Sequence, residues 1–139
     1  MERILIYLTA VAGLAKDLHY TLSGESFYGN HLLMDRIYDG LYDFVDEIKE
    51  NYFMYLGLDV PKSKDVFEQA AELLDGLDTT GKRLRTLLEY LKDIVYLCDE
   101  AANNDKYDCG DNDLLGRIAS KMKNDIGLFR KVVEPTGEG

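Results

Sequence analysis

Four stretches of this chain repeat apolar side chains every three or four residues, which is the period of an amphipathic α-helix. The first stretch has six such positions: Ile4, Leu8, Val11, Ala15, Leu18 and Leu22. We expect this first helix to end near residues 23–24, where the period stops at a serine and a glycine. Four amphipathic helices bury their apolar faces most simply against one another, so the pattern predicts an all-α protein built as a four-helix bundle.

The second stretch is long, and Ser26 stands at the N-cap position of a helix that we expect to run to about Tyr55. Its apolar and aromatic residues cover more than one stripe, which indicates contacts with both the bundle and a neighbouring molecule. They are Phe27, Met34, Ile37, Tyr38, Leu41, Phe44, Val45 and Ile48. Gly57 and Pro61 then break the pattern. With Ser63 as its cap, a short helix is expected over residues 64–77, lying across the bundle.

Two further amphipathic stretches complete the expected bundle. The third carries Leu84, Leu87, Leu88, Leu91, Ile94, Val95 and Cys98 on one face. The fourth carries Leu115, Ile118, Met122, Ile126, Phe129 and Val133, after a polar loop over residues 103–113. A chain of 139 residues suits one domain. We therefore expect a bundle domain over residues 1–134 and a flexible C-terminal tail over residues 135–139.

The charge balance restricts the partners of the chain. A net charge of −10 opposes binding to a phosphate backbone, so DNA binding is not expected, whereas cations are attracted. The apolar stretch at residues 4–14 is shorter than the ~20 residues that a membrane helix needs. The two cysteines, Cys98 on an apolar stripe and Cys109 in a polar loop, favour free thiols in a cytoplasmic protein, with a disulfide between them as the less favoured alternative.

The two histidines of the chain begin a series of polar residues at helical spacing. His31 and Asp35 are four residues apart and share one helix face, as do Asp46 and Glu50. The 11 residues from Asp35 to Asp46 bring a regular helix back to within about 20° of its starting direction. At 1.5 Å per residue, however, these two carboxylates are roughly 16 Å apart, too far for one chain to close one site.

Two copies of this helix packed antiparallel about a two-fold axis would solve that problem. His31 would then face Glu50, and Asp35 would face Asp46, which gives two equivalent mixed sites. Gly40 lies beside the midpoint of this register, where a missing side chain would let the helices cross, although an ordinary tolerated glycine explains it nearly as well. Imidazole with several carboxylates suits Fe(II), Mn(II) or Zn(II), and iron best where carboxylates predominate.

The spacing of these residues resembles that of the Dps family, ferritin-like mini-shells named for DNA protection during starvation. The residues that carry the resemblance are His19, Tyr20, Gly24, Phe27, His31, Asp35, Asp46 and Glu50. Spacings of 12, 4, 11 and 4 residues match the family's ferroxidase ligands at all five positions. The resemblance covers about residues 2–134 and implies a ferritin-like four-helix bundle with a short extra helix between the second and third long helices.

The resemblance also implies a site and an activity. His19, His31 and Asp35 of one subunit would hold iron together with Asp46 and Glu50 of its two-fold mate. The assembly would be a cytoplasmic dodecamer that oxidises Fe(II) with hydrogen peroxide or oxygen, stores ferric mineral and protects against oxidative stress. Zinc or manganese is the alternative metal at the same site. The alternative function is an architectural shell or interaction module whose bound metal only stabilises the dimer, without significant ferroxidase activity.

Other positions distinguish this chain within the resemblance. An ordinary ferritin site needs Glu-x-x-His pairs, but Lys16 and Tyr28 stand three residues before the two histidines. Tyr20 stands where the family usually has tryptophan, so an aromatic redox role beside the iron would pass to tyrosine. The family's iron pores are lined by acidic residues near the start of the last helix, for which Asp111 and Asp113 are the nearest candidates.

Overall fold

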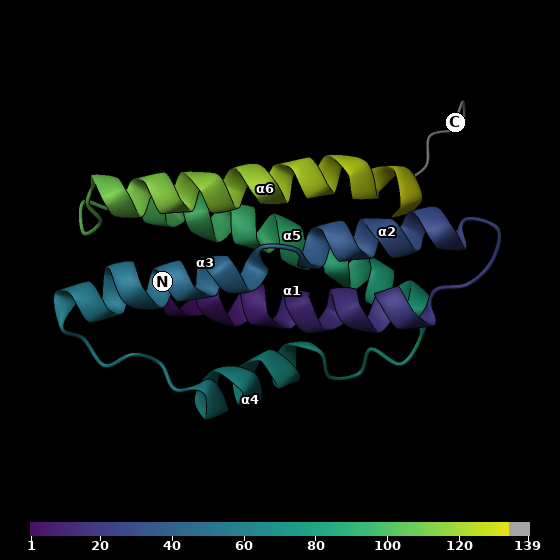
Figure 1. Ribbon diagram of the computed structural model, residues 1–139, viewed down its shortest axis with the longest axis horizontal. Helices are drawn as coiled ribbons and strands as arrows, with labels where there is room; N and C mark the ends of the chain where they lie inside the picture. The colour runs from purple at the N-terminus through teal and green to yellow at the C-terminus, as the bar shows by residue number, and fades with distance from the viewer. Residues whose placement is uncertain (134–139) are drawn as a thin grey trace.

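A computed structural model describes residues 1–133, and over that range every element of regular structure is helical (Figure 1). Four rows of helix form the bundle: α1 (Glu2–Thr21); a broken row of α2 (Phe27–Tyr38), α3 (Leu41–Ile48) and the π-helix η1 (Lys49–Met54); α5 (Thr80–Ala102); and α6 (Cys109–Val133). The short helix α4 (Ser63–Leu73) packs on α1 outside the bundle. The expected all-α four-helix bundle with a short extra helix is therefore confirmed.

The division into a bundle domain and a tail stays a prediction, because residues 135–139 lie outside the described part of the chain. No helix within residues 1–133 is both long and apolar enough to cross a bilayer. Cys98 is buried in the core and Cys109 is exposed, and both thiols are free, in agreement with the expectation from the sequence.

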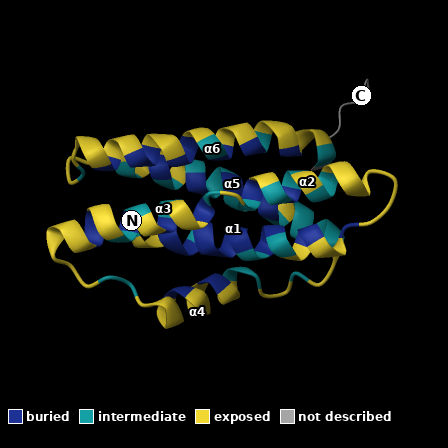
Figure 2. Ribbon diagram, viewed as in Figure 1, coloured by how far each residue is buried: buried dark blue, intermediate teal, exposed yellow. Residues whose placement is uncertain are grey.

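Helix α1 forms the centre of the core. It packs against α2 and α3 on one side, against α5 on another and against α4 on its outer face, so little of it reaches solvent (Figure 2). All six positions that define the first apolar stretch of the sequence are buried: Ile4, Leu8, Val11, Ala15, Leu18 and Leu22. Burying each large aliphatic side chain contributes about 1.5–3 kcal/mol. This burial fixes the position of the C-terminal end of α1 within the bundle.

The second long helix is not continuous, so the expectation of one helix to about Tyr55 is wrong. Asp39 has φ −60° and ψ 132°, and Gly40 has φ 80° and ψ −5°, which are the angles of the two central residues of a type II turn. A positive φ at the second of these positions favours glycine, because a side chain there is strained. A Cβ atom on Gly40 would contact nothing else in the chain, so the backbone conformation by itself requires glycine here, and the crossing with a second copy stays a prediction.

A second irregularity follows in the same row. The backbone winds as a π-helix over Lys49–Met54, which turns the later side chains away from the direction that a regular α-helix would give them. Asp46 lies between the turn at Gly40 and this π-helix, and Glu50 lies inside the π-helix. The expected alignment of Asp46 and Glu50 with Asp35 therefore does not hold as a property of one regular helix.

The last helix begins inside the stretch expected to be a loop. The amide of Asp111 donates to Oδ1 of Asp108 at 2.8 Å, and the amide of Asp108 donates to Oδ2 of Asp111 at 3.3 Å. This reciprocal pair has the form of a capping box and starts α6 at Cys109. Asp111 is consequently buried, and its burial raises the pKa of its carboxyl, so it caps the helix instead of facing solvent.

The other helix starts differ from expectation in smaller ways. Ser26 does occupy the N-cap position of α2, but its side chain makes no capping hydrogen bond. Ser63 is the first residue of α4, and Lys62 takes the N-cap position that the serine was expected to fill. These differences move helix ends by a residue or two and leave the bundle unchanged.

Candidate metal centre

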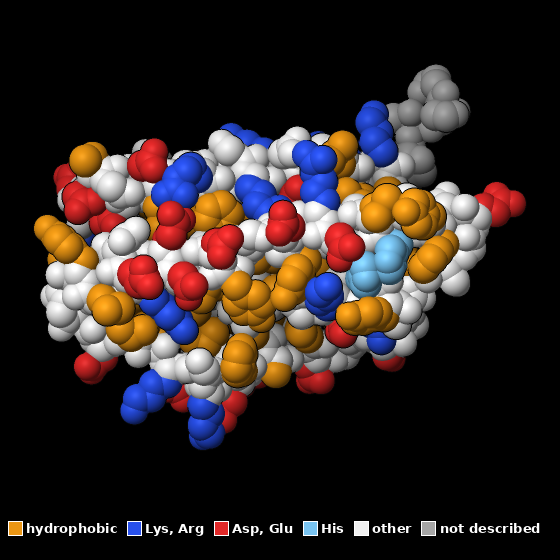
Figure 3. Space-filling view, viewed as in Figure 1, with side chains coloured by type: hydrophobic (Ala, Val, Ile, Leu, Met, Phe, Trp, Pro, Cys, Tyr) orange, Lys and Arg blue, Asp and Glu red, His pale blue; other side chains and the backbone are white. Residues whose placement is uncertain are grey.

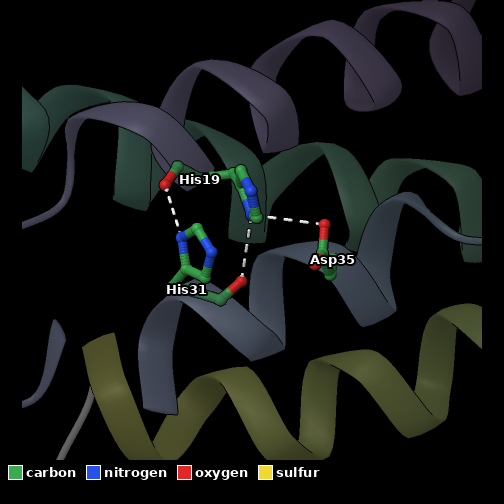
Figure 4. A group of neighbouring side chains, drawn as sticks. All are labelled: His19, His31 and Asp35. Atoms are coloured by element: carbon green, nitrogen blue, oxygen red, sulfur yellow. Dashed lines mark hydrogen bonds and ion pairs between the residues drawn. The ribbon is translucent and has the colours of Figure 1, made fainter. Parts of the chain in front are cut away.

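Three potential metal ligands meet where α1 and α2 pack together. His19 comes from the last turn of α1, and His31 and Asp35 come from successive turns of α2. One donor atom from each of the three residues lies within 4.8 Å of the others (Figure 4). His19 is buried, His31 is partly buried and the side chain of Asp35 is half exposed, so the cluster opens toward solvent on the α2 side.

The two imidazole rings are held by each other's backbone. Nδ1 of His31 lies 2.8 Å from the carbonyl oxygen of His19, and Nδ1 of His19 lies 3.2 Å from the carbonyl oxygen of His31. The rings stack with centroids 3.6 Å apart. Because a carbonyl oxygen only accepts hydrogen bonds, these contacts assign a hydrogen to each Nδ1, and the neutral tautomer that carries it there keeps its Nε2 lone pair for a metal. The backbone thus selects the tautomer that a metal site needs.

Asp35 completes the cluster with a carboxylate. Its Oδ1 atom lies 3.2 Å from Nδ1 of His19. Two imidazole nitrogens and one carboxylate oxygen form a donor set that suits Fe(II) and related transition metals, while Ca²⁺ and Mg²⁺ prefer oxygen ligands alone. Three protein ligands leave further coordination positions open, which a second protein chain, water or an oxidant can fill.

Lys16 also lies beside the cluster. In the sequence it was noted only because it stands where an ordinary ferritin site would have a glutamate. Its Nζ atom lies 3.7 Å from Oδ1 of Asp35 and 4.5 Å from the centroid of the Tyr38 ring. An ammonium group at this place offsets the negative charge that would attract a cation to Asp35. The sequence could have predicted that Lys16 lies near His19, because residues three apart on a helix share a face and Lys16 stands three residues before His19.

Aromatic and apolar side chains surround the histidines. The ring of Tyr20 packs edge-on to His19 at 5.0 Å between centroids, and the ring of Phe27 lies 5.1 Å from that of His31. In the space-filling view the two imidazoles sit among apolar side chains near one end of the molecule (Figure 3). Tyr20, Tyr28 and Leu32 are all exposed there. The open side of the cluster is therefore bordered by an apolar surface.

Asp46 and Glu50 do not join this cluster. Over residues 1–133, the only group of side chains placed to hold a metal is His19, His31 and Asp35. Asp46 on α3 and Glu50 on η1 are both exposed. Glu50 lines a shallow depression that extends to the start of α6. In a single chain, therefore, the five expected ligands form two separate groups.

The two residues expected to line an iron pore, Asp111 and Asp113, both make hydrogen bonds within the chain. Asp111 caps α6, as described above, and Asp113 accepts a hydrogen bond from Nε of Arg117 at 3.0 Å. A pore at a three-fold axis is formed between chains, so the assignment of Asp111 and Asp113 to it stays a prediction.

Comparison with known proteins gives a consistent answer at the level of the fold. No protein-family model matches the chain, and no curated protein has a significantly similar sequence. Among solved structures, Dps from Thermosynechococcus elongatus superposes with a TM-score of 0.83 at 17% identity, covering 99% of this chain and 89% of that one. DpsC from Streptomyces coelicolor gives a TM-score of 0.79 at 25% identity, with 96% and 80% covered.

A third solved structure, of Dps from Microbacterium arborescens in the high iron form, has a TM-score of 0.76 at 15% identity and covers 95% of this chain and 88% of that one. The likeness in each case extends over nearly the whole chain, although few residues are identical. The agreement therefore concerns the course of the backbone.

Proposed function

Because the chain has a Dps-like, ferritin-like four-helix-bundle fold, we propose that it is a ferroxidase and iron-storage protein. Fe(II) is its substrate, hydrogen peroxide or oxygen is its oxidant, and ferric mineral is stored in a hollow shell, which protects against oxidative stress. The observation that carries this proposal is the cluster of His19, His31 and Asp35, in which one donor atom from each residue lies within 4.8 Å of the others.

The proposed chemistry needs two irons for each peroxide. Two Fe(II) ions deliver one electron each, the O–O bond of hydrogen peroxide breaks, and two protons complete two water molecules. Delivery of a single electron would instead release a hydroxyl radical. The role of His19, His31 and Asp35 is to bind Fe(II) beside the apolar surface described above, with coordination positions left for the oxidant. Zinc or manganese can occupy the same donors.

We propose that the site is completed by a second copy of the chain. Asp46 and Glu50 of a two-fold mate would supply the carboxylates that the cluster lacks within one chain. Three features support this arrangement: the three-ligand cluster is open on one side, the two acids are exposed, and exposed apolar residues border the opening. Two-fold pairing gives two equivalent sites for each dimer, and six such dimers form the proposed dodecamer.

The proposed location is the cytoplasm, and the proposed partners are other copies of the chain together with Fe(II) and peroxide. A net charge of −10 opposes direct DNA binding, which a mobility shift at physiological salt would test. No shift is expected.

The alternative is an architectural shell whose bound metal only stabilises the dimer. The positive charge of Lys16 beside Asp35 opposes the binding of every divalent cation to the cluster, so it does not distinguish the two functions. In this second reading a tightly coordinating ion such as zinc would occupy the site without oxidation chemistry.

A direct experiment separates the two functions. The native assembly is purified, its mass and metal content are measured, and Fe(II) oxidation is followed after peroxide is added, beside a buffer blank and a His31→Ala variant. The proposed ferroxidase accelerates oxidation over buffer, and His31→Ala loses most of that acceleration. An intact assembly that binds zinc and gives no acceleration would sink the enzyme proposal and support the architectural one.

A further inference from the structure

Two cationic side chains of α6 contact the broken helical row on opposite sides of its turn. Nζ of Lys121 donates to the carbonyl oxygen of Arg36 in the last turn of α2, at 3.0 Å. Nη1 of Arg117 donates to Oε2 and Oε1 of Glu47 on α3, at 2.9 and 3.3 Å. Lys121 and Arg117 are four residues apart and so lie on one face of α6. A single regular helix therefore holds both pieces of the row.

The contact from Lys121 replaces part of the helix that the turn interrupts. In a continuous α-helix the carbonyl of Arg36 would accept from the amide of residue 40, but the chain turns at Asp39 and Gly40. Lys121 supplies a donor to that carbonyl instead, and its Nζ atom also donates to Oδ2 of Asp125 at 2.8 Å. The side chains of Lys121 and Asp125 are 20% and 1% exposed, so their ion pair is largely shielded from solvent, whereas the bond to the Arg36 carbonyl is exposed.

The contact from Arg117 acts on the other piece. Nε of Arg117 donates to Oδ2 of Asp113 at 3.0 Å, which fixes the guanidinium group from its own helix before it reaches Glu47. Glu47 is the neighbour of Asp46 and stands three residues before Glu50. The side chains of Arg117 and Glu47 are 47% and 35% exposed, and a pair so open to water adds little to global stability. We expect the Arg117–Glu47 pair to affect the position of α3 more than the stability of the whole chain.

We propose that Arg117 and Lys121 are positioning residues that set the placement of α3 relative to α2. This inference rests on the proposed ferroxidase function with composite sites. In that arrangement α2 of each chain supplies one group of ligands and the α3–η1 segment supplies the other. A change in the angle between α2 and α3 would therefore displace ligands in both sites of a two-fold pair. Misplacing a reacting group by about 1 Å can cost on the order of 100-fold in rate.

The first test is a charge swap across the exposed pair. Arg117→Glu and Glu47→Arg are each expected to lower kcat for peroxide-driven Fe(II) oxidation by about tenfold, because α3 loses its anchor. The double variant restores an opposite-charge pair and is expected to recover to within about threefold of the native rate. If the double variant stays as slow as the single variants, the loss arises from charge beside Asp46, and the inference is overturned.

The second test concerns the contacts that Lys121 makes with Arg36 and Asp125. Lys121→Met is expected to lower kcat about tenfold, and Lys121→Arg is expected to restore most of it, since a guanidinium group can also donate to a carbonyl and a carboxylate. Lys123→Met is the matched control: this lysine is exposed on the same helix, and the rate should stay native. Where Lys121→Met does not assemble, the exposed charge swap still decides the question.

Two readouts do not depend on turnover. Hydrogen exchange at the amides of residues 38–41 should quicken in the anchor variants and not in Lys123→Met. The absorption spectrum of bound Co(II) should change, because the coordination geometry changes. Native exchange and a native Co(II) spectrum in assembled Arg117→Glu would overturn the inference. Failure of the native protein to oxidise Fe(II) would instead remove the proposed function, and these two measurements would still test whether α6 positions α3.

Discussion

The two ends of the broken helical row differ in how completely one chain prepares them. At the α2 end, His31 is stacked on His19, and each ring is fixed by the other's backbone carbonyl. At the α3–η1 end, Asp46 and Glu50 are exposed, and neither makes a side-chain hydrogen bond or ion pair within residues 1–133. In the proposed composite site, folding of a single chain brings together His19, His31 and Asp35 but leaves Asp46 and Glu50 without a partner ligand. Assembly would then be a condition for the proposed chemistry.

The largest expected effect tests whether the two ends act across chains. His31→Ala and Glu50→Ala should each abolish most Fe(II) oxidation. When the two variants are reassembled together, half of the random dimers contain one of each chain, and one of the two sites in such a dimer is intact. About a quarter of native activity should return, measured as the initial rate of peroxide-driven oxidation.

A matched mixture provides the control. His31→Ala and Asp35→Ala alter the same end of the row, so no pairing of these chains restores an intact site, and their mixture should stay inactive. Recovery in this control, or none in the first mixture despite co-assembly shown by native mass spectrometry, would contradict the composite site.

The next effect tests the turn that separates the two ends. Gly40→Ala places a side chain at φ 80° and should lower the free energy of unfolding by about 1 kcal/mol. Relief of that strain moves α3 relative to α2, so kcat should fall by about tenfold. Gly57→Ala is the control, because Gly57 has φ 69° and lies beyond the ligands. Chemical denaturation and oxidation rates should show a similar loss of stability in both variants but a loss of kcat only in Gly40→Ala.

A smaller effect concerns the metal affinity of the cluster at the α2 end. Lys16→Met removes a positive charge 3.7 Å from Asp35 and should tighten the Kd for Zn(II). Both side chains are partly exposed, so the gain is limited by solvent screening to about threefold to tenfold. Competition with a zinc-binding dye would measure it, with Lys123→Met as the remote control. Unchanged or weaker binding would mean that Lys16 supports Asp35 instead of competing with the cation.

The smallest effect on function concerns the two thiols. Burial raises the pKa of Cys98 to about 12, whereas Cys109 is exposed near the depression that Glu50 lines. The reactive form is the thiolate, which burial disfavours at Cys98, so iodoacetamide should modify the exposed Cys109 and leave the Cys98 thiol intact in folded protein. Peptide mass spectrometry would show this, and the modified protein should keep its oxidation rate within about twofold. Fast labelling of Cys98 would indicate that the core opens.

Parts of this structure were predictable because local patterns determine them. The apolar period of α1 identified its buried positions, and helical spacing placed His31 beside Asp35, whereas His19 was assigned to the same site only through the family resemblance. The turn at Gly40 was missed, although Asp-Gly is a recognised turn signal, because a single glycine inside an apolar helical pattern is often tolerated. Local sequence therefore gave the helices but not their interruption.

Other parts depend on contacts between distant residues and had no local signal. Lys121 contacts Arg36 from 85 residues away, and Arg117 contacts Glu47 from 70 residues away. The helical period shows that Arg117 and Lys121 share a face of α6, but it does not show which helix that face meets. The contact of Lys16 with Asp35 likewise depends on how α1 and α2 are packed. Only the assembled bundle reveals these pairs.

The reciprocal histidine contact also has a consequence for the order in which the chain folds. His19 and His31 are only 12 residues apart, and a loop of about ten residues closes within tens of nanoseconds, whereas the contacts from α6 must wait for most of the chain. The entropy lost on closing so short a loop is small. We therefore expect the corner between α1 and α2 to form among the earliest tertiary contacts and the attachment of α6 among the last. A newly made chain would then hold its two imidazoles together before its bundle is complete.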